Sequence, residues 1–134
     1  MVKITTDPLS PGQIISMVKT GGSGCVAAYI GLIRDNSRGK SVLSVEYSDP
    51  DNTAEAGLQQ IIGEASNKWQ LNEMAIYHRI GVLKVGDINL VVAVAAAHRG
   101  EGFAACQYAI DSFKEKLPTR KKETYLDGTC FEGE

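Results

Sequence analysis

The chain has 134 residues with 14 Lys and Arg against 16 Asp and Glu, which gives a formal net charge of -2. Hydrophobic residues make up 43% and charged residues 22%, a balance typical of globular proteins that excludes intrinsic disorder. The length predicts one domain over residues 1–134 and excludes a large two-domain enzyme. The longest apolar run, residues 90–97, is too short to cross a bilayer. Since no signal peptide opens the chain either, we expect a cytoplasmic protein that does not span a membrane.

Three strands and two helices are predicted in the first half. Residues 2–5 favour a short strand, and Ser10-Pro11 is typical of a helix start, with the helix running to about Lys19. A β-branched and apolar run predicts a strand over residues 25–33. Residues 42–47 have period two, which predicts a strand with Leu43, Val45 and Tyr47 on one face.

A long amphipathic helix is predicted next, capped near Asp49 or Asp51. Its apolar residues recur every three or four positions and therefore share one face. These residues are Ala54, Leu58, Ile61, Ile62 and Ala65.

The second half predicts strands over residues 74–80, closed by Gly81, and over residues 88–97. Residues 88–97 are apolar on both faces apart from Asn89, which indicates a central strand covered on both sides. A helix over residues 100–117, stopped by Pro118, carries an apolar stripe. The stripe comprises Phe103, Cys106, Ile110, Phe113 and Leu117.

Two short strands, residues 119–125 and 129–131, are predicted to flank a turn at Asp127-Gly128. The whole order is β-α-β-β-α-β-β-α-β-β. It predicts the α+β class, with a mixed or antiparallel sheet and about three helices packed on it.

The cysteines are odd in number and widely spaced, without a C-x-x-C pair, as is usual in a reducing compartment. Cys25 falls in a strand pattern and Cys106 on the helical stripe, so we expect both to be buried structural thiols. His78 and His98 are the only histidines and neither lies near a cysteine pair, so no zinc or other metal site is predicted.

Two cationic positions follow apolar strands. His98 and Arg99 stand where a strand ends and a helix begins, and the unpaired N–H groups of a helix N-terminus favour an anion there. Alternatively, both side chains only meet solvent. Arg34 ends another apolar strand, where it could bind a phosphate or carboxylate through two hydrogen bonds, or simply lie at the surface.

Further cations lie towards the C-terminus. If residues 119–125 form a strand, Lys121 and Glu123 face one way while Arg120 and Lys122 face the other. The alternative is a solvated basic face. Lys114 lies at the margin of the helical stripe, where its ammonium could take part in proton transfer or could remain in water.

Several classes of protein are disfavoured. The chain carries neither G-x-x-x-x-G-K-[ST] nor G-x-G-x-x-G after a strand, and we expect no cofactor. It has no G-x-S-x-G and no Cys/His pair, so the nucleophile is expected to arrive with a substrate or partner. A net charge of -2 makes a nucleic-acid-binding domain the least favoured class.

Four segments carry motifs in a recognisable order. GCVAAYIGLIRD, at residues 24–35, is a strand of small apolar residues that ends in G-x-[VI]-R. IYHRIGVLKVGD, at residues 76–87, matches I-x-H-R-x-G-x-L-x-x-G-[DE]. AHR at residues 97–99 precedes a helix with FA and AIDSFK, and residues 118–128 match P-x-W-K-[KR]-E…G. Together these segments, over residues 24–131, resemble the large, catalytic subunit of molybdopterin synthase.

Three positions depart from the family pattern. Arg120 replaces the usual aromatic residue before the motif lysine, and Phe131 stands where tryptophan is common. Thr53 stands where the second helix often opens with methionine. These departures concern the shape of the pocket rather than the type of reaction.

The resemblance implies an α/β hammerhead fold and a sulfur-insertion reaction. In this family a small ubiquitin-like carrier brings a thiocarboxylate on its C-terminal glycine, which follows another glycine, into a pocket of the large subunit. The substrate is cyclic pyranopterin monophosphate, and two sulfur transfers give the dithiolene of molybdopterin.

By motif position, the resemblance implies that Lys114 and Lys121 are catalytic, assisting proton transfer and stabilising the charge of the acyl intermediate. The residues implied to hold the phosphate or the pterin are Arg34, His98, Arg99, Lys122 and Glu123, with the backbone around Leu32 and Ile33. Because side chains alternate along a strand, Lys122 is expected to act through its backbone or from the rim.

The family resemblance also implies a homodimer with one carrier at each end, in which both copies can line a site. The sequence does not assign His98 or Arg99 to either copy. An alternative of another class is a non-catalytic dimeric α+β module that senses an anionic metabolite, which would need the cations but no carrier.

Overall fold

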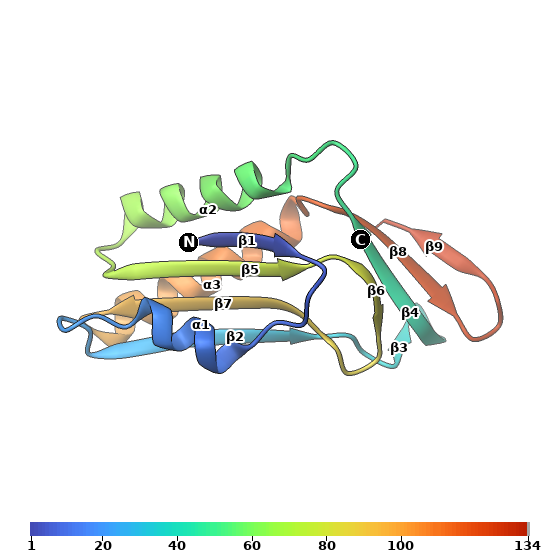
Figure 1. Ribbon diagram of the computed structural model, residues 1–134, viewed down its shortest axis with the longest axis horizontal. Helices are drawn as coiled ribbons and strands as arrows, with labels where there is room; N and C mark the ends of the chain where they lie inside the picture. Colours follow the sequence, from blue (N-terminus) through green and yellow to red (C-terminus); the bar gives the residue numbers. More distant parts are fainter. Residues whose placement is uncertain (134) are drawn as a thin grey trace.

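The computed structural model describes residues 1–133. Its elements, in chain order, are β1 (Val2–Thr5), α1 (Pro11–Val18), β2 (Cys25–Leu32), β3 (Asn36–Ser37), β4 (Lys40–Ser48), α2 (Ala54–Lys68), β5 (Glu73–Arg79), β6 (Gly81–Lys84), β7 (Ile88–Ala96), α3 (Arg99–Glu115), β8 (Arg120–Tyr125) and β9 (Cys130–Glu132). Three helices packed on mixed sheets confirm the predicted α+β class (Figure 1).

The first sheet has the strand order β1-β5-β7-β2, in which β1 runs parallel to β5 and the other pairs are antiparallel. Strand β7 lies inside this sheet and is buried from Leu90 to Ala96, which confirms the predicted central strand. Its side chains alternate between two cores. Leu90, Val92 and Val94 pack under α2 and α3, while Val91, Ala93 and Ala95 pack under α1. Figure 1 shows α1 and α3 on opposite sides of the sheet.

The second sheet has the order β3-β4-β8-β9, with β6 also paired to β4, and lies at one end of the first sheet (Figure 1). Its core contains Val45, Tyr47, Leu83 and Tyr125. Strands β3 and β6 were not predicted. The first has only two residues, and the second begins at Gly81, whose φ of 99° bends the chain sharply after β5.

Two predicted orientations are wrong. Leu43 is 52% exposed, because a register irregularity between Val42 and Ser44 turns Val42 inward in its place. Phe103 is 66% exposed rather than part of the buried stripe. Helix α3 instead turns Gly102 towards β2, so closely that a Cβ on Gly102 would lie 3.2 Å from the Cys25 sulfur.

The helix termini follow the predicted signals. Pro11 opens α1, and the Asp49 carboxylate accepts hydrogen bonds from the backbone N–H groups of Thr53 and Ala54 at 3.1 and 3.2 Å. Helix α3 ends at Glu115, two residues earlier than predicted. None of the helices within residues 1–133 combines the length and apolar character that a membrane crossing requires.

The three thiols differ in environment. Cys106 is 6% exposed, and burial raises its pKa to about 11, which confirms a structural thiol. Cys25 is half-buried, with its sulfur 3.7 Å from the carbonyl oxygen of Ala96, so it is less enclosed than predicted. All three cysteines are free.

Candidate active site

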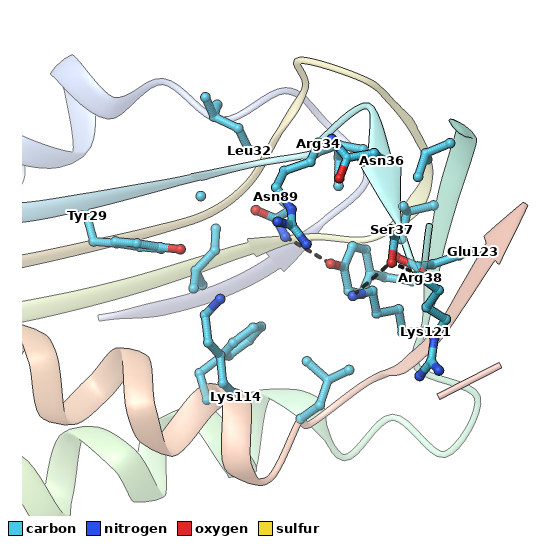
Figure 2. A pocket seen from close by; sticks show the side chains of 18 residues that line it. Tyr29, Leu32, Arg34, Asn36, Ser37, Arg38, Asn89, Lys114, Lys121 and Glu123 are labelled. Carbon is cyan, nitrogen blue, oxygen red and sulfur yellow. Dashed lines mark hydrogen bonds and ion pairs between the residues drawn. The ribbon is translucent and has the colours of Figure 1, made fainter. Parts of the chain in front are cut away.

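A cavity of about 690 Å³ opens where the end of β2, the β3–β4 hairpin, β8 and the last turn of α3 meet (Figure 2). Six of the residues proposed from the sequence line it: Leu32, Ile33, Arg34, Lys114, Lys121 and Glu123. Three of the predicted cations, Arg34, Lys114 and Lys121, which are distant along the chain, therefore converge within one copy.

The two lysines approach the cavity from different elements. Lys114 extends from the last turn of α3, beside the buried Phe113. Lys121 lies on β8 opposite Tyr47 of β4, on the inner face of the second sheet. Figure 2 shows the two side chains on facing walls of the same cavity.

Glu123 is the carboxylate partner of Lys121. Its Oε2 lies 3.8 Å from Lys121 Nζ, while its Oε1 accepts hydrogen bonds of 2.8 Å from the hydroxyls of Ser37 and Tyr125. Burial raises the pKa of Tyr125, and its hydrogen bond to Glu123 acts in the same direction. Glu123 is only 7% exposed and is held by these three partners, so it orients Lys121 within the wall.

Arg34 lies at the rim, two residues after the end of β2, with an exposed side chain. Ile33 holds that strand end: its N–H donates to Asp87 O at 3.0 Å, and its carbonyl accepts from Gly86 N–H at 2.9 Å. These backbone groups are therefore engaged within the fold, and Ile33 offers the cavity its side chain. The Leu32 side chain is 57% exposed.

Lys122 lies outside this cavity. In β8 it faces away from Lys121 and pairs across strands with Glu46 of β4 and Glu132 of β9. It lines a second hollow of about 410 Å³, which shares Leu117 and Lys121 with the first. The predicted alternation of Lys121 and Lys122 is thus confirmed.

His98 and Arg99 are not brought to the cavity within one copy. His98 caps the N-terminus of α3 and Arg99 opens the helix, both exposed. Roughly 22 Å of helix, at 1.5 Å per residue, separates Arg99 from Lys114. A site that uses all of these residues therefore needs a second copy.

A buried histidine lies beneath the cavity. His78 on β5 is fully buried, and its ring nitrogens lie 2.8 Å from the carbonyl oxygen of Asn89 and 2.9 Å from the hydroxyl of Thr119. Burial lowers the pKa of His78 to about 4, against smaller opposing effects of the Asn89 carbonyl and the Asp49 carboxylate. The imidazole is neutral at pH 7.

Acidification is expected to destabilise the fold through His78. Below pH 6.5 the unfolded chain protonates this histidine, whereas the folded chain does not until near pH 4. Stability is thus lost as pH falls through this window, by about 2–3 kcal/mol between pH 7 and pH 4.5. Urea unfolding at both pH values should show a smaller loss for His78→Gln than for the wild type. Equal losses in the two proteins would contradict this assignment.

Sequence reasoning missed several residues that line the cavity. Arg38, at the tip of the β3–β4 hairpin with φ 55°, places its guanidinium 3.4 Å from the centre of the Phe131 ring. Asn89 donates from Nδ2 to the Tyr47 hydroxyl at 2.9 Å, while its Oδ1 is buried and accepts no hydrogen bond from residues 1–133. The one available signal was Asn89 itself, the polar exception in an apolar strand.

The sequence matches the MoaE protein family over residues 4–116. A molybdopterin synthase catalytic subunit from Rattus norvegicus is 36% identical over 129 residues, covering 96% of this chain and 64% of the relative. This chain thus spans less than two thirds of the length of that relative.

Solved structures of similar proteins have the same fold. Molybdopterin synthase from Staphylococcus aureus superposes with a TM-score of 0.90 at 32% identity, covering 98% of this chain and 95% of that one. A chain from the complex of subunits 1 and 2 of the molybdopterin-converting factor from Helicobacter pylori has a TM-score of 0.78 at 12% identity. That alignment covers 99% of this chain and 90% of the other, and shows a shared fold.

Fold and cavity together define an α+β protein with lysines and an arginine converging on one hollow. The match over residues 4–116 makes the assignment specific: the chain belongs to the MoaE family, which includes molybdopterin synthase catalytic subunits.

Proposed function

We propose that this chain is the catalytic subunit of a molybdopterin synthase and acts as a sulfurtransferase. It transfers sulfur from the C-terminal thiocarboxylate of a small ubiquitin-like carrier to cyclic pyranopterin monophosphate and so builds the dithiolene of molybdopterin. The observation that carries this proposal is the convergence of Lys114, Lys121 and Arg34 on one cavity. None of the described lining residues is a cysteine, in keeping with a nucleophile that arrives on a partner.

Each transfer forms a C–S bond at a carbon of the pterin side chain while a C–O bond to that carbon breaks, and the oxygen leaves as water or stays with the phosphate. The C–S bond to the carrier's acyl carbon is then cleaved by hydrolysis. Water supplies the oxygen with which the carrier leaves as a carboxylate. Negative charge develops on the acyl oxygen, and ammonium groups fixed beside it stabilise that charge. We assign this role, and the accompanying proton transfers, to Lys114 and Lys121, with Glu123 orienting Lys121.

The substrate phosphate needs cations as well. Arg34 at the rim offers a planar guanidinium suited to two parallel hydrogen bonds. We propose that His98 and Arg99 complete the anion site from the second copy of a homodimer, because the length of α3 keeps them from the cavity of their own copy. Lys122 contributes from the rim, through the second hollow.

The sulfur carrier is the second partner. A protein of this fold assembles with another subunit in the Helicobacter pylori complex, which supports a two-subunit assembly here. The cavity takes its walls from both sheets, so we propose that residues 1–134 work as one unit. Three free cysteines suit a reducing compartment, and we propose that the reaction takes place in the cytoplasm.

Reconstitution tests this function. The purified chain is incubated with a thiocarboxylated carrier ending in Gly-Gly and with cyclic pyranopterin monophosphate, and the dithiolene product is measured. We expect product only when all three are present, and co-purification of the carrier with the chain. Binding of the pterin without carrier binding or product would instead favour the non-catalytic metabolite sensor.

A further inference from the structure

His78 and Thr119, a hydrogen-bonded pair that we call the joint, connect three parts of the fold beneath the cavity. His78 of β5 contacts the backbone of β7 through Asn89, and it contacts the residue just before β8 through Thr119. Thr119 is 7% exposed and precedes Lys121 by two residues, immediately before β8 begins. The joint therefore connects the first sheet directly to the strand that carries Lys121.

The chemistry of the partners fixes the tautomer of His78. A backbone carbonyl can only accept, so Nδ1 must carry the hydrogen and donate it to Asn89 O at 2.8 Å. Nε2 of the neutral ring is then an acceptor, and the Thr119 hydroxyl donates to it at 2.9 Å. Both ring nitrogens of the imidazole are thus hydrogen-bonded, and the Thr119 hydroxyl supplies the donor to Nε2.

Aromatic packing also places the His78 ring against α3, the helix that carries Lys114. The His78 ring packs in T-shaped arrangements against Phe113, at a centroid distance of 5.0 Å, and against Tyr47, at 4.8 Å, with interplanar angles of 84° and 79°. Phe113 immediately precedes Lys114 on α3, and Tyr47 is the cross-strand neighbour of Lys121. One side chain thus contacts neighbours of both lysines.

We propose that His78 and Thr119 are positioning residues that set the separation of Lys114 and Lys121 across the cavity. This inference rests on the proposed function, since it assigns how the two lysines are held during sulfur transfer. Neither residue lines the 690 Å³ cavity that holds both lysines, although Thr119 lines the second hollow, so each acts on the lysines through the elements it connects. Misplacing a reacting group by an ångström can cost about a hundredfold in rate, which makes such a joint important for the reaction.

A pair of Thr119 variants isolates the hydrogen bond. Thr119→Val keeps the shape of the side chain but removes the donor to Nε2, whereas Thr119→Ser keeps the hydroxyl. In the reconstituted reaction we expect Thr119→Val to lower kcat per folded molecule by about tenfold or more, with KM for the pterin changed by less than about threefold. Thr119→Ser should recover most of kcat.

A second readout follows the lysine without turnover. The rate at which an amine-acylating reagent labels Lys121, relative to the exposed Lys84 of β6, is measured by mass spectrometry in each variant. We expect this ratio to change in Thr119→Val and to return in Thr119→Ser. Ile14→Val, in the separate core under α1, is the control for a loss of packing alone and should alter neither readout.

The outcomes distinguish a failure of the positioning role from a failure of the proposed function. Wild-type kcat and an unchanged labelling ratio in Thr119→Val would overturn the positioning role. So would losses that match those of Ile14→Val, or that Thr119→Ser does not repair. If Lys121→Ala itself retained wild-type activity, the proposed function would fail instead. Should Thr119→Val not fold, Thr119→Ala replaces it and the same criteria apply.

Discussion

Replacing Lys121 by alanine is expected to lower the rate of sulfur transfer by about 10²–10³-fold, and Lys114→Ala by a similar factor, as is typical when one charge-stabilising group is removed. The loss should appear mainly in kcat, because the ammonium groups act on charge that develops in the transition state. The rate of sulfur transfer is measured as single-turnover product formation, with thiocarboxylated carrier and pterin at saturating concentrations.

The fold offers good controls for this experiment. After Lys121→Ala, Glu123 keeps its hydrogen bonds to Ser37 and Tyr125, so no buried carboxylate loses every partner and unfolding is not expected. Lys84→Ala removes an exposed lysine of β6 that is not part of the cavity and should leave the rate unchanged. Wild-type turnover by both cavity-lysine variants would show that the catalytic assignment is wrong.

The sequence predicted those parts of the fold that are encoded by local periodicity. The apolar face of α2 follows from the three- and four-residue spacing of its apolar side chains. The doubly covered strand β7 follows from a run that is apolar at almost every position. The bend at Gly81 and the two-residue strand β3 depend on pairing with β4, which is distant in sequence from β6. No local pattern distinguishes such short strands from turns.

The site was predictable in its members but not in its arrangement. Motif positions identified Lys114, Lys121 and Arg34, and strand alternation separated Lys121 from Lys122. The family resemblance implied that both copies can line a site but did not assign Arg99 to either copy. The length of α3 and the position of the cavity at its C-terminal end support our proposal that Arg99 acts from the second copy. The role of His78 as a joint depends on contacts with three distant elements that no spacing encodes.

The shared site predicts complementation between two inactive proteins. Arg99→Ala and Lys121→Ala should each abolish most activity alone. In a mixed dimer, one cavity would combine the intact Lys121 of one copy with the intact Arg99 of the other, while the second cavity would carry both defects. Equal mixing gives about half mixed dimers with one intact site each, so activity should recover to about one quarter of the wild type.

The measurement uses the two variants co-expressed with different affinity tags, so that mixed dimers are isolated before the assay. Purified mixed dimers should reach about half of wild-type kcat per dimer, with KM for the pterin unchanged, because the surviving site is complete. If both residues served the same copy, every cavity of a mixed dimer would carry one defect and no recovery would occur. Full activity of Arg99→Ala alone would remove Arg99 from the site altogether. The complementation thus distinguishes the two geometries by the presence or absence of activity rather than by its degree.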